Sequence, residues 1–163
     1  MDQRYLKQRL LYSPKSGVFY WIQPPPGHSD LLGEEAGSAC LSDSKPYWYI
    51  QIDRVKYKRS RLAFLYLVGF MPQDQVDHIN GNSLDDRWQN LRPATAMQNA
   101  WNHKSRARGN DLPMGVRKNA SSGRYAARIG VRGKQISLGS FNTPEEAHAV
   151  YLNARKQYFG EFA

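Results

Sequence analysis

Residues 76–102 gather side chains that could act on a phosphate ester: an acid beside a histidine, followed by a run of asparagines. Hydrolysis of a phosphodiester needs a base to deprotonate water and a positive charge near the leaving oxygen. His78 can be the base, and a hard cation such as Mg²⁺ can supply the charge. Because such a cation takes few oxygen ligands from protein, a carboxylate and an amide oxygen are enough, with water and phosphate as the other ligands.

The spacing within this stretch allows one shared site. Asp77 and His78 are neighbours on a predicted strand, so their side chains point to opposite sides and can reach metal and water separately. Asn90 follows His78 by twelve positions across a loop, and Asn99 follows Asn90 by nine inside a predicted helix. The chain between them is long enough for the helix to fold back onto the strands. A second asparagine can hold the far nitrogen of the histidine and fix its tautomer.

The segment VDHINGNSLDDRWQNLRPATAMQNAWN resembles the HNH motif of homing-type endonucleases, which have the ββα-metal fold. The spacers HINGN, DDR and NLR contribute to this resemblance, which covers about 30 residues. The resemblance implies that Asp77 and Asn99 hold one divalent metal ion, with Mg²⁺ expected and Mn²⁺ as the alternative. It also implies that His78 activates water and that Asn90 orients His78.

Other interpretations of the same residues stay open. An isolated Asp-His pair is usually a surface pair, and the NGN triplet at 80–82 is typical of a turn, because Asn and Gly tolerate positive φ. Asn102 and His103 lie one helical turn beyond Asn99 and compete with it as ligands. Three apolar residues of the stretch are expected in the core: Leu84, Trp88 and Leu91.

The C-terminal region, residues 114–163, has a different pattern. Three strand-like segments, MGVRKN, GRYAARIGV and KQISLGSF, precede a helix that Thr143 caps and Pro144 begins. About 47 residues here resemble the Apetala/ethylene-response-factor DNA-binding domain, through GVR, YAARI, LGSF and TPEEA. That resemblance implies a three-stranded sheet laid in the major groove of DNA, and a small curved sheet fits a groove about 12 Å wide.

Strand alternation predicts which C-terminal residues face the partner. Tyr125, Ala127 and Ile129 are expected against the helix, with the alternate positions outward. Arg128, Gly130 and Ser137 depart from the plant pattern, so the plant target sequence is not carried over. The expected DNA-contacting residues are Arg117, Lys118, Arg124, Arg128, Arg132, Lys134, Gln135 and Ser137.

Charge and composition favour the same class of partner. The net charge is +9, and the segment 104–134 holds nine Lys or Arg against one acid, which predicts a polyanionic partner. The single cysteine, Cys40, excludes a disulfide within the chain and a Cys-rich zinc site. No apolar run is long enough for a signal peptide or a membrane span. We therefore expect a cytoplasmic protein of a bacterial or phage-infected cell, a monomer that needs no nucleotide cofactor.

The predicted fold class is α+β. A ββα-metal nuclease unit with N-terminal antiparallel strands is expected at 1–103, with its motif at about 75–103. A basic linker at 104–113 leads to a three-stranded antiparallel sheet covered by one helix at 114–163. Within the first unit the patterns predict a helix at 2–11, strands at 18–22, 47–52 and 55–59, and a helix from Ser60 to Gly69. Strands in QVDHI and NLRPA and a helix after Thr95 follow.

These patterns together predict a metal-dependent endonuclease of duplex DNA, of the homing or phage type. Four basic residues before the motif could contact phosphates: Lys56, Lys58, Arg59 and Arg61. The alternative from another class is a non-cleaving DNA-binding regulator with a vestigial nuclease half. RNA binding ranks last, since the C-terminal region has few aromatic side chains on which bases could stack.

Overall fold

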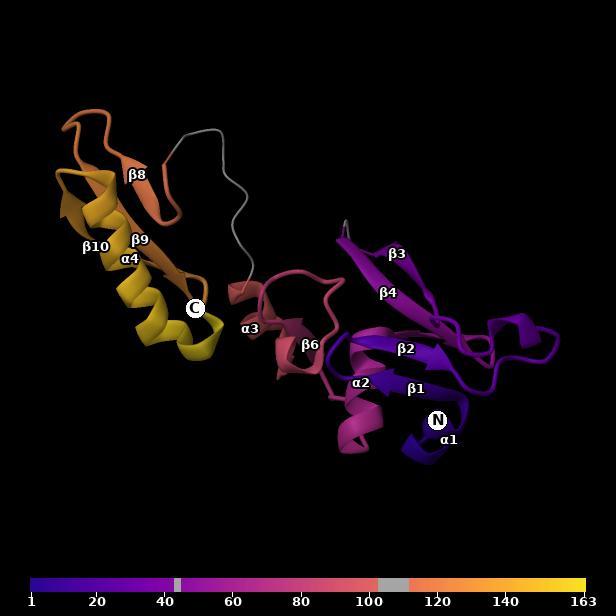
Figure 1. The fold of residues 1–163 in the computed structure, drawn as a ribbon. Helices are drawn as coiled ribbons and strands as arrows, with labels where there is room; N and C mark the ends of the chain where they lie inside the picture. The colour runs from indigo at the N-terminus through magenta and orange to yellow at the C-terminus, as the bar shows by residue number, and fades with distance from the viewer. Residues whose placement is uncertain (43–44, 103–111) are drawn as a thin grey trace. The chain divides into compact units, whose positions relative to one another are not determined.

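The structure, a computed structural model, describes residues 1–42, 45–102 and 112–163. It contains helices and small antiparallel sheets, as the α+β prediction requires (Figure 1). The chain divides into two compact units, Met1–Asn99 and Ala100–Ala163. The basic linker expected at 104–113 lies almost entirely outside the described residues.

The elements of the first unit form three antiparallel sheets, β1–β2, β3–β4–β5 and β6–β7. Two short 3₁₀ helices, η1 (Ser29–Leu31) and η2 (Trp88–Asn90), lie in the connections. In chain order the elements up to the unit boundary are α1 (Gln3–Arg9), β1 (Leu10–Ser13), β2 (Val18–Trp21), β3 (Ser38–Ser42), β4 (Lys45–Ile52), β5 (Val55–Lys58), α2 (Arg59–Val68), β6 (Gln75–His78), β7 (Leu91–Ala94) and α3 (Ala96–Trp101).

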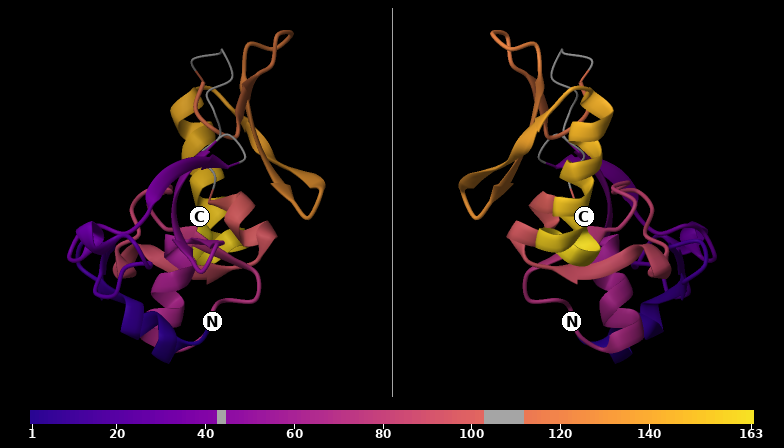
Figure 2. Two further views of the ribbon diagram at one scale, coloured as in Figure 1. Left: turned by 90° about the vertical axis from the view of Figure 1, so that its right-hand side faces the viewer. Right: turned by 90° about the vertical axis from the view of Figure 1, so that its left-hand side faces the viewer.

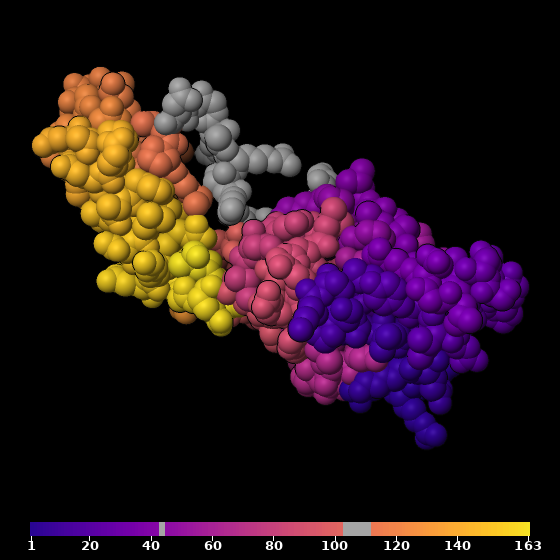
Figure 3. Space-filling model, viewed as in Figure 1, coloured from indigo at the N-terminus to yellow at the C-terminus, as the bar shows by residue number. Residues whose placement is uncertain are grey.

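One apolar core joins the first two sheets to α1 and α2. Leu6 of α1, Phe19 of β2, Ile50 of β4 and Leu62 of α2 are all fully buried in it. The space-filling view shows the indigo residues of the N-terminal segment packed without a gap against the magenta residues of α2 (Figure 3). Leu91 belongs to this core, which therefore extends to the strand that follows the candidate catalytic loop.

The N-terminal part differs from the prediction at three places. The predicted helix at 2–11 ends at Arg9, because Leu10 pairs with Trp21 and begins β1. β3, which pairs with β4, was not predicted. Ser60 does not cap α2: β5 runs directly into this helix, so Lys58 is the N-cap residue and Ser60 is buried in the first turn. The predicted end at Gly69 is confirmed, with φ of +90°.

The second unit is a three-stranded antiparallel sheet in the order β10–β9–β8 with one covering helix. Both views of Figure 2 show α4 lying along one face of this sheet. The predicted capping box is confirmed, since Thr143 and Glu146 each accept a hydrogen bond from the backbone of the other. The elements are β8 (Val116–Lys118), β9 (Tyr125–Val131), β10 (Lys134–Phe141), α4 (Pro144–Phe159) and η3 (Gly160–Phe162).

Among the described residues, no helix combines the length and the apolar character that crossing a bilayer demands.

Candidate active site

The β6–β7 hairpin carries the candidate catalytic residues. Asp77 pairs with Arg92 and His78 pairs with Leu91 across the ladder. Successive residues of a strand point to opposite faces, so Asp77 and His78 diverge, as the sequence predicts. Both are buried, at 3% and 5% exposure. Burial of two polar side chains side by side requires partners for each of them.

The partner of the His78 ring is Asp86, on the loop between the two strands. His78 Nε2 lies 2.8 Å from Asp86 Oδ1, and Asp86 is 2% exposed. A carboxylate only accepts hydrogen bonds, so Nε2 is the ring nitrogen that donates to Asp86. In the sequence Asp86 lies within the spacer DDR, and it was not predicted as a site residue. The only signal in the sequence was a second acid beside Asp85 within the motif.

The same carboxylate binds an arginine from α2. Arg59 Nε donates to Asp86 Oδ2 at 2.8 Å, and Arg59 Nη1 donates to Glu35 at 2.8 Å. The guanidinium also lies over the Trp48 ring, 4.4 Å from its centroid. Arg59 is 3% exposed. The expectation that Arg59 contacts phosphate is therefore wrong.

The other basic residues near the motif differ in what they offer to a ligand. Arg61 donates to the carbonyl oxygens of Pro72 and Asp74. Lys56 is exposed, whereas Lys58 is half-buried, with its Nζ 3.9 Å from the centroid of the Tyr47 ring. The Tyr47 ring centroid is 6.3 Å from that of His78.

Asn90 binds the loop rather than the His78 ring. Its Nδ2 donates to Asn80 Oδ1 at 3.1 Å and to the Asp85 carbonyl at 2.7 Å, and its Oδ1 accepts from the Asn80 backbone at 3.0 Å. Within the described part of the chain these are its side-chain hydrogen bonds. Asn90 thus closes the loop that presents Asp86. The direct contact with His78 that the resemblance implies does not occur in this structure.

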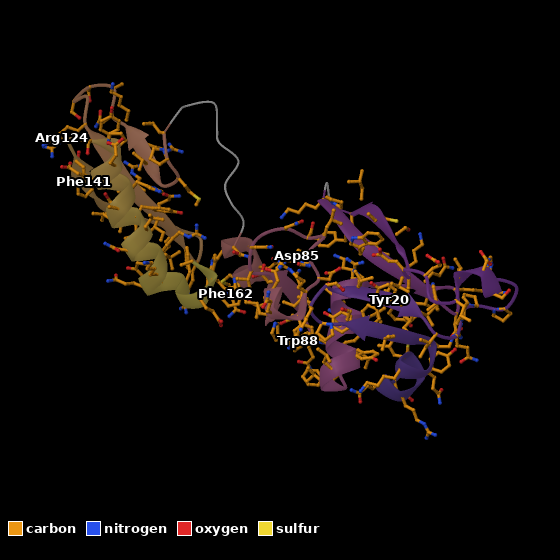
Figure 4. All side chains as sticks on the ribbon, viewed as in Figure 1. Tyr20, Asp85, Trp88, Arg124, Phe141 and Phe162 are labelled. Carbon is orange, nitrogen blue, oxygen red and sulfur yellow. The ribbon has the colours of Figure 1, made fainter. Side chains whose placement is uncertain are left out.

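The remainder of the loop confirms the turn interpretation of NGN. The Asn82 backbone donates to Asn80 Oδ1, and the Leu84 backbone donates to Asn82 Oδ1. Figure 4 labels Asp85 and Trp88 on this segment. Trp88 packs edge-on against Phe64 of α2, with centroids 4.8 Å apart. The tryptophan is therefore a packing residue, as predicted.

Arg87 sets the electrostatics of the exposed side of the loop. Its guanidinium donates to both carboxylate oxygens of Asp85, at 2.7 and 2.6 Å. These hydrogen bonds lower the pKa of Asp85 to about 2 against the opposing effect of burial. Asp85 and Asp86 are adjacent but serve different partners, one at the surface and one in the interior.

The candidate metal ligands are an acid and an amide. Asp77 Oδ2 accepts from Arg92 Nε at 2.8 Å and from Nη2 at 2.7 Å. Asn99 Nδ2 donates to Gln75 Oε1. Gln75 and Asp77 are two apart on β6 and share a face, so α3 brings Asn99 to the side of the strand that bears Asp77.

The donor set fits a hard cation, although it is small. With its Nδ2 engaged by Gln75, Asn99 has its carbonyl oxygen as the available ligand type. Among residues 1–42, 45–102 and 112–163 no cluster of three or more His, Cys, Asp or Glu could hold a metal ion. One carboxylate and one amide oxygen suit Mg²⁺, which keeps several waters. Of the two competing ligands, Asn102 lies in the turn after α3, and His103 lies outside the described residues.

In the second unit all eight predicted DNA-contacting residues are exposed. The pairs Arg128–Ser137 and Gly130–Gln135 share the sheet face opposite α4, where Arg117 also lies, paired with Ala126. Lys118 pairs with Tyr125 and Lys134 with Val131, so these two lysines project to the other side. Arg124 donates to the Ser140 carbonyl at 2.8 Å, and Arg132 lies in the turn after β9.

Comparison with known proteins identifies the motif. Residues 57–101, which include Asp77, His78, Asn90 and Asn99, match the HNH endonuclease family. The chain is 32% identical over 129 residues to an uncharacterized HNH endonuclease of Acanthamoeba polyphaga mimivirus, covering 74% of this chain and 66% of that protein. It is 30% identical over 88 residues to Protein 3.8 of Escherichia phage T7, covering 54% and 72%.

The chain spans about two thirds of the length of the mimivirus relative. No solved structure matches it. The resemblance of residues 114–163 to the Apetala/ethylene-response-factor domain stays a prediction. Residues 57–101 of this chain therefore carry an HNH endonuclease domain.

Proposed function

We propose that this protein is a metal-dependent endonuclease that hydrolyses phosphodiester bonds of duplex DNA, of the homing or phage type. One observation carries the proposal: a buried histidine on β6, held at Nε2 by Asp86 at 2.8 Å, lies next to the acid Asp77 within the matched HNH segment. A base with one fixed nitrogen and an adjacent oxygen ligand are the two components that metal-assisted hydrolysis needs.

Each residue of the site has a distinct proposed role. His78 takes a proton from the attacking water at Nδ1, because Nε2 is engaged by Asp86. Asp77 and the Asn99 carbonyl would hold one divalent cation, Mg²⁺ or Mn²⁺. When bound, that ion stabilises negative charge on the phosphate and on the leaving oxygen. Asn90 keeps the loop closed around Asp86.

The sheet of the second unit is the proposed duplex-binding surface. Its outward face carries Arg117 and Arg128 beside the small residues Ala126 and Gly130. Small side chains let the strands approach the groove closely, while the arginines reach phosphates or base edges. A tethered DNA-binding unit raises the effective concentration of substrate at the nuclease unit. Lys56 and Lys58 of β5 supply further positive charge on the first unit.

Plasmid nicking tests the proposal. Supercoiled plasmid should be converted to the open-circular or linear form with Mg²⁺, and EDTA should stop the conversion. His78→Ala should abolish cleavage while duplex binding stays within about twofold, since the base is lost but the basic surfaces remain. His28→Ala, a change at an exposed histidine in a loop, is the matched control. Undiminished nicking by the His78 variant would refute the assignment.

One observation favours a second candidate, a DNA-binding regulator that does not cleave. Asp77 already has a cationic partner in Arg92, 2.7 Å away, which compensates the charge of the carboxylate. Such a regulator would bind duplex DNA equally with and without Mg²⁺ and would leave supercoiled plasmid intact. Competition between duplex DNA and RNA in the same binding assay tests the third possibility, RNA binding.

A further inference from the structure

We infer that Asp86 is the residue that positions His78: its carboxylate fixes the imidazole in the tautomer with the proton on Nε2. The family resemblance gave this task to Asn90, whereas the structure places Asn90 on the loop backbone. Only the catalytic consequence, activation of water by His78, rests on the proposed nuclease function. The tautomer itself can be measured without any substrate.

Both oxygens of Asp86 are engaged in a way that fixes its orientation. Oδ1 lies 2.8 Å from His78 Nε2, and Oδ2 accepts from Arg59 Nε at 2.8 Å. All three side chains are at most 6% exposed. Rotation of the carboxylate would break a buried ion pair, so Arg59 maintains the orientation in which Oδ1 faces the ring.

The backbone of Asp86 is held as firmly as its side chain. Tyr12 Oη donates to the Asp86 carbonyl at 2.8 Å in the core. Gly17, at φ of +76°, packs so closely that a Cβ there would lie 2.4 Å from the Asp86 carbonyl carbon. Arg59 is itself fixed by Glu35 and Trp48. Contacts from β1, the following turn, α2 and β4 thus converge on the group that meets His78.

Asp86→Asn is the sharpest test because it conserves shape and reverses one hydrogen bond. Arg59 can only donate, so it takes the amide oxygen and turns the Asn Nδ2 donor toward His78. A donor at that place requires an unprotonated Nε2, which forces the proton onto Nδ1 and removes the base. Misplacing the tautomer in this way in a serine protease triad costs about 10⁴-fold in kcat. We therefore expect a loss of about 10²–10⁴-fold in single-turnover nicking, with KM for DNA nearly unchanged.

The experiment combines ¹⁵N NMR of the histidine rings with nicking by the full-length protein. The signals that are absent from the His78→Ala spectrum identify His78. Wild type should show a protonated Nε2 and Asp86→Asn a protonated Nδ1. Asp30→Asn makes the same acid-to-amide change at an exposed residue of η1, outside the contacts that hold Asp86, so its His78 signals should match wild type.

Two results would overturn the inference: a protonated Nε2 in Asp86→Asn, or a reversed tautomer with wild-type nicking. Asp86→Ala gives an independent check, since loss of the acceptor should give a mixture of both tautomers. If wild type cleaves no DNA but its tautomer reverses in Asp86→Asn, the proposed function fails and the positioning contact stands.

Discussion

Each buried acid of the site has a cation beside it, and the two pairs have different consequences. Asp86 with Arg59 orients the His78 ring, whereas Asp77 with Arg92 neutralises a candidate metal ligand. A divalent ion bound at the proposed site would therefore compensate the same buried charge as Arg92. Removing the arginine should leave Asp77 more dependent on metal, because an uncompensated buried carboxylate is strongly destabilising.

Arg92→Ala tests that dependence. Without divalent ions the variant should lose about 3–5 kcal/mol of unfolding free energy. Mn²⁺ should then raise its melting temperature more than that of wild type, since the ion binds the folded state and replaces the lost charge. Arg87→Ala, which breaks the exposed pair with Asp85, should cost at most about 1 kcal/mol. Equal Mn²⁺ shifts in wild type and Arg92→Ala would contradict Asp77 as a metal ligand.

Asp85 gives a prediction about acid. Its folded-state pKa of about 2 lies below the unfolded value of about 3.9. A depressed carboxyl pKa contributes stability above the unfolded pKa, and this contribution is lost as the pH falls from about 4 to about 2. A ¹³C carboxyl titration should find the low value in wild type and a value near 4 in Arg87→Ala. The same pKa in both proteins would show that Arg87 is not the cause.

At the residue scale, the sequence reveals types and spacing but not partners. Asp77, His78, Asn90 and Asn99 follow from a local pattern, and the structure places all four on the β6–β7–α3 segment. The contact of Asp86 with Arg59 joins positions 27 apart, and its contact with Tyr12 joins positions 74 apart. Such contacts depend on tertiary packing, which no local pattern encodes. The same limit explains the wrong expectation for Arg59.

At the element scale, periodicity and capping residues predict those helices and strands whose conformation is determined by the local sequence. The second unit was predicted strand by strand, and Thr143, Pro144 and Gly160 bound α4 as expected. β1 and β3 were missed because their strand character comes from pairing with β2 and β4. In α1 helical spacing continues past Arg9, and cross-strand pairing overrides it at Leu10.

The turn between β1 and β2 matters to the site through Gly17. Gly17→Ala places a Cβ 2.4 Å from Arg87 N and from the Asp86 carbonyl carbon, in a left-handed backbone conformation. Gly27→Ala has a similar φ of +81° but open space around it, so it costs only the backbone term of about 1–2 kcal/mol.

Gly17→Ala should be less stable than Gly27→Ala by about 1–3 kcal/mol, and it should also slow nicking because Asp86 moves. Urea denaturation of both variants at pH 7 measures the difference. Equal losses of stability would mean that the close approach of the turn to Asp86 has no energetic importance.

At the scale of the whole molecule, the net charge of +9 predicts that the proposed DNA binding depends strongly on salt concentration. Each phosphate contact adds close to one unit to the slope of log K against log salt. Arg128→Ala should reduce the slope by about 1 if Arg128 grips a phosphate. It should instead change sequence preference if Arg128 reads a base.

Lys15→Ala is the matched control, because it removes the same charge from an exposed turn of the first unit. Its slope should equal that of wild type. Titration of a labelled duplex at several KCl concentrations gives both slopes. Identical curves for wild type and Arg128→Ala would remove Arg128, and the outward sheet face with it, from the proposed DNA surface.

The contacts of Tyr12 and Gly17 with Asp86 set the minimum portable size of the proposed nuclease. The 45 residues from 57 to 101 that define the family contain the histidine and its acid, but not the first hairpin that braces them. A graft of only that segment onto another scaffold would transfer His78 and Asp86 without the contacts from Tyr12 and Gly17 that hold Asp86 in place. A chimera therefore also needs the β1–β2 hairpin to keep Asp86, and with it the imidazole, in the same orientation.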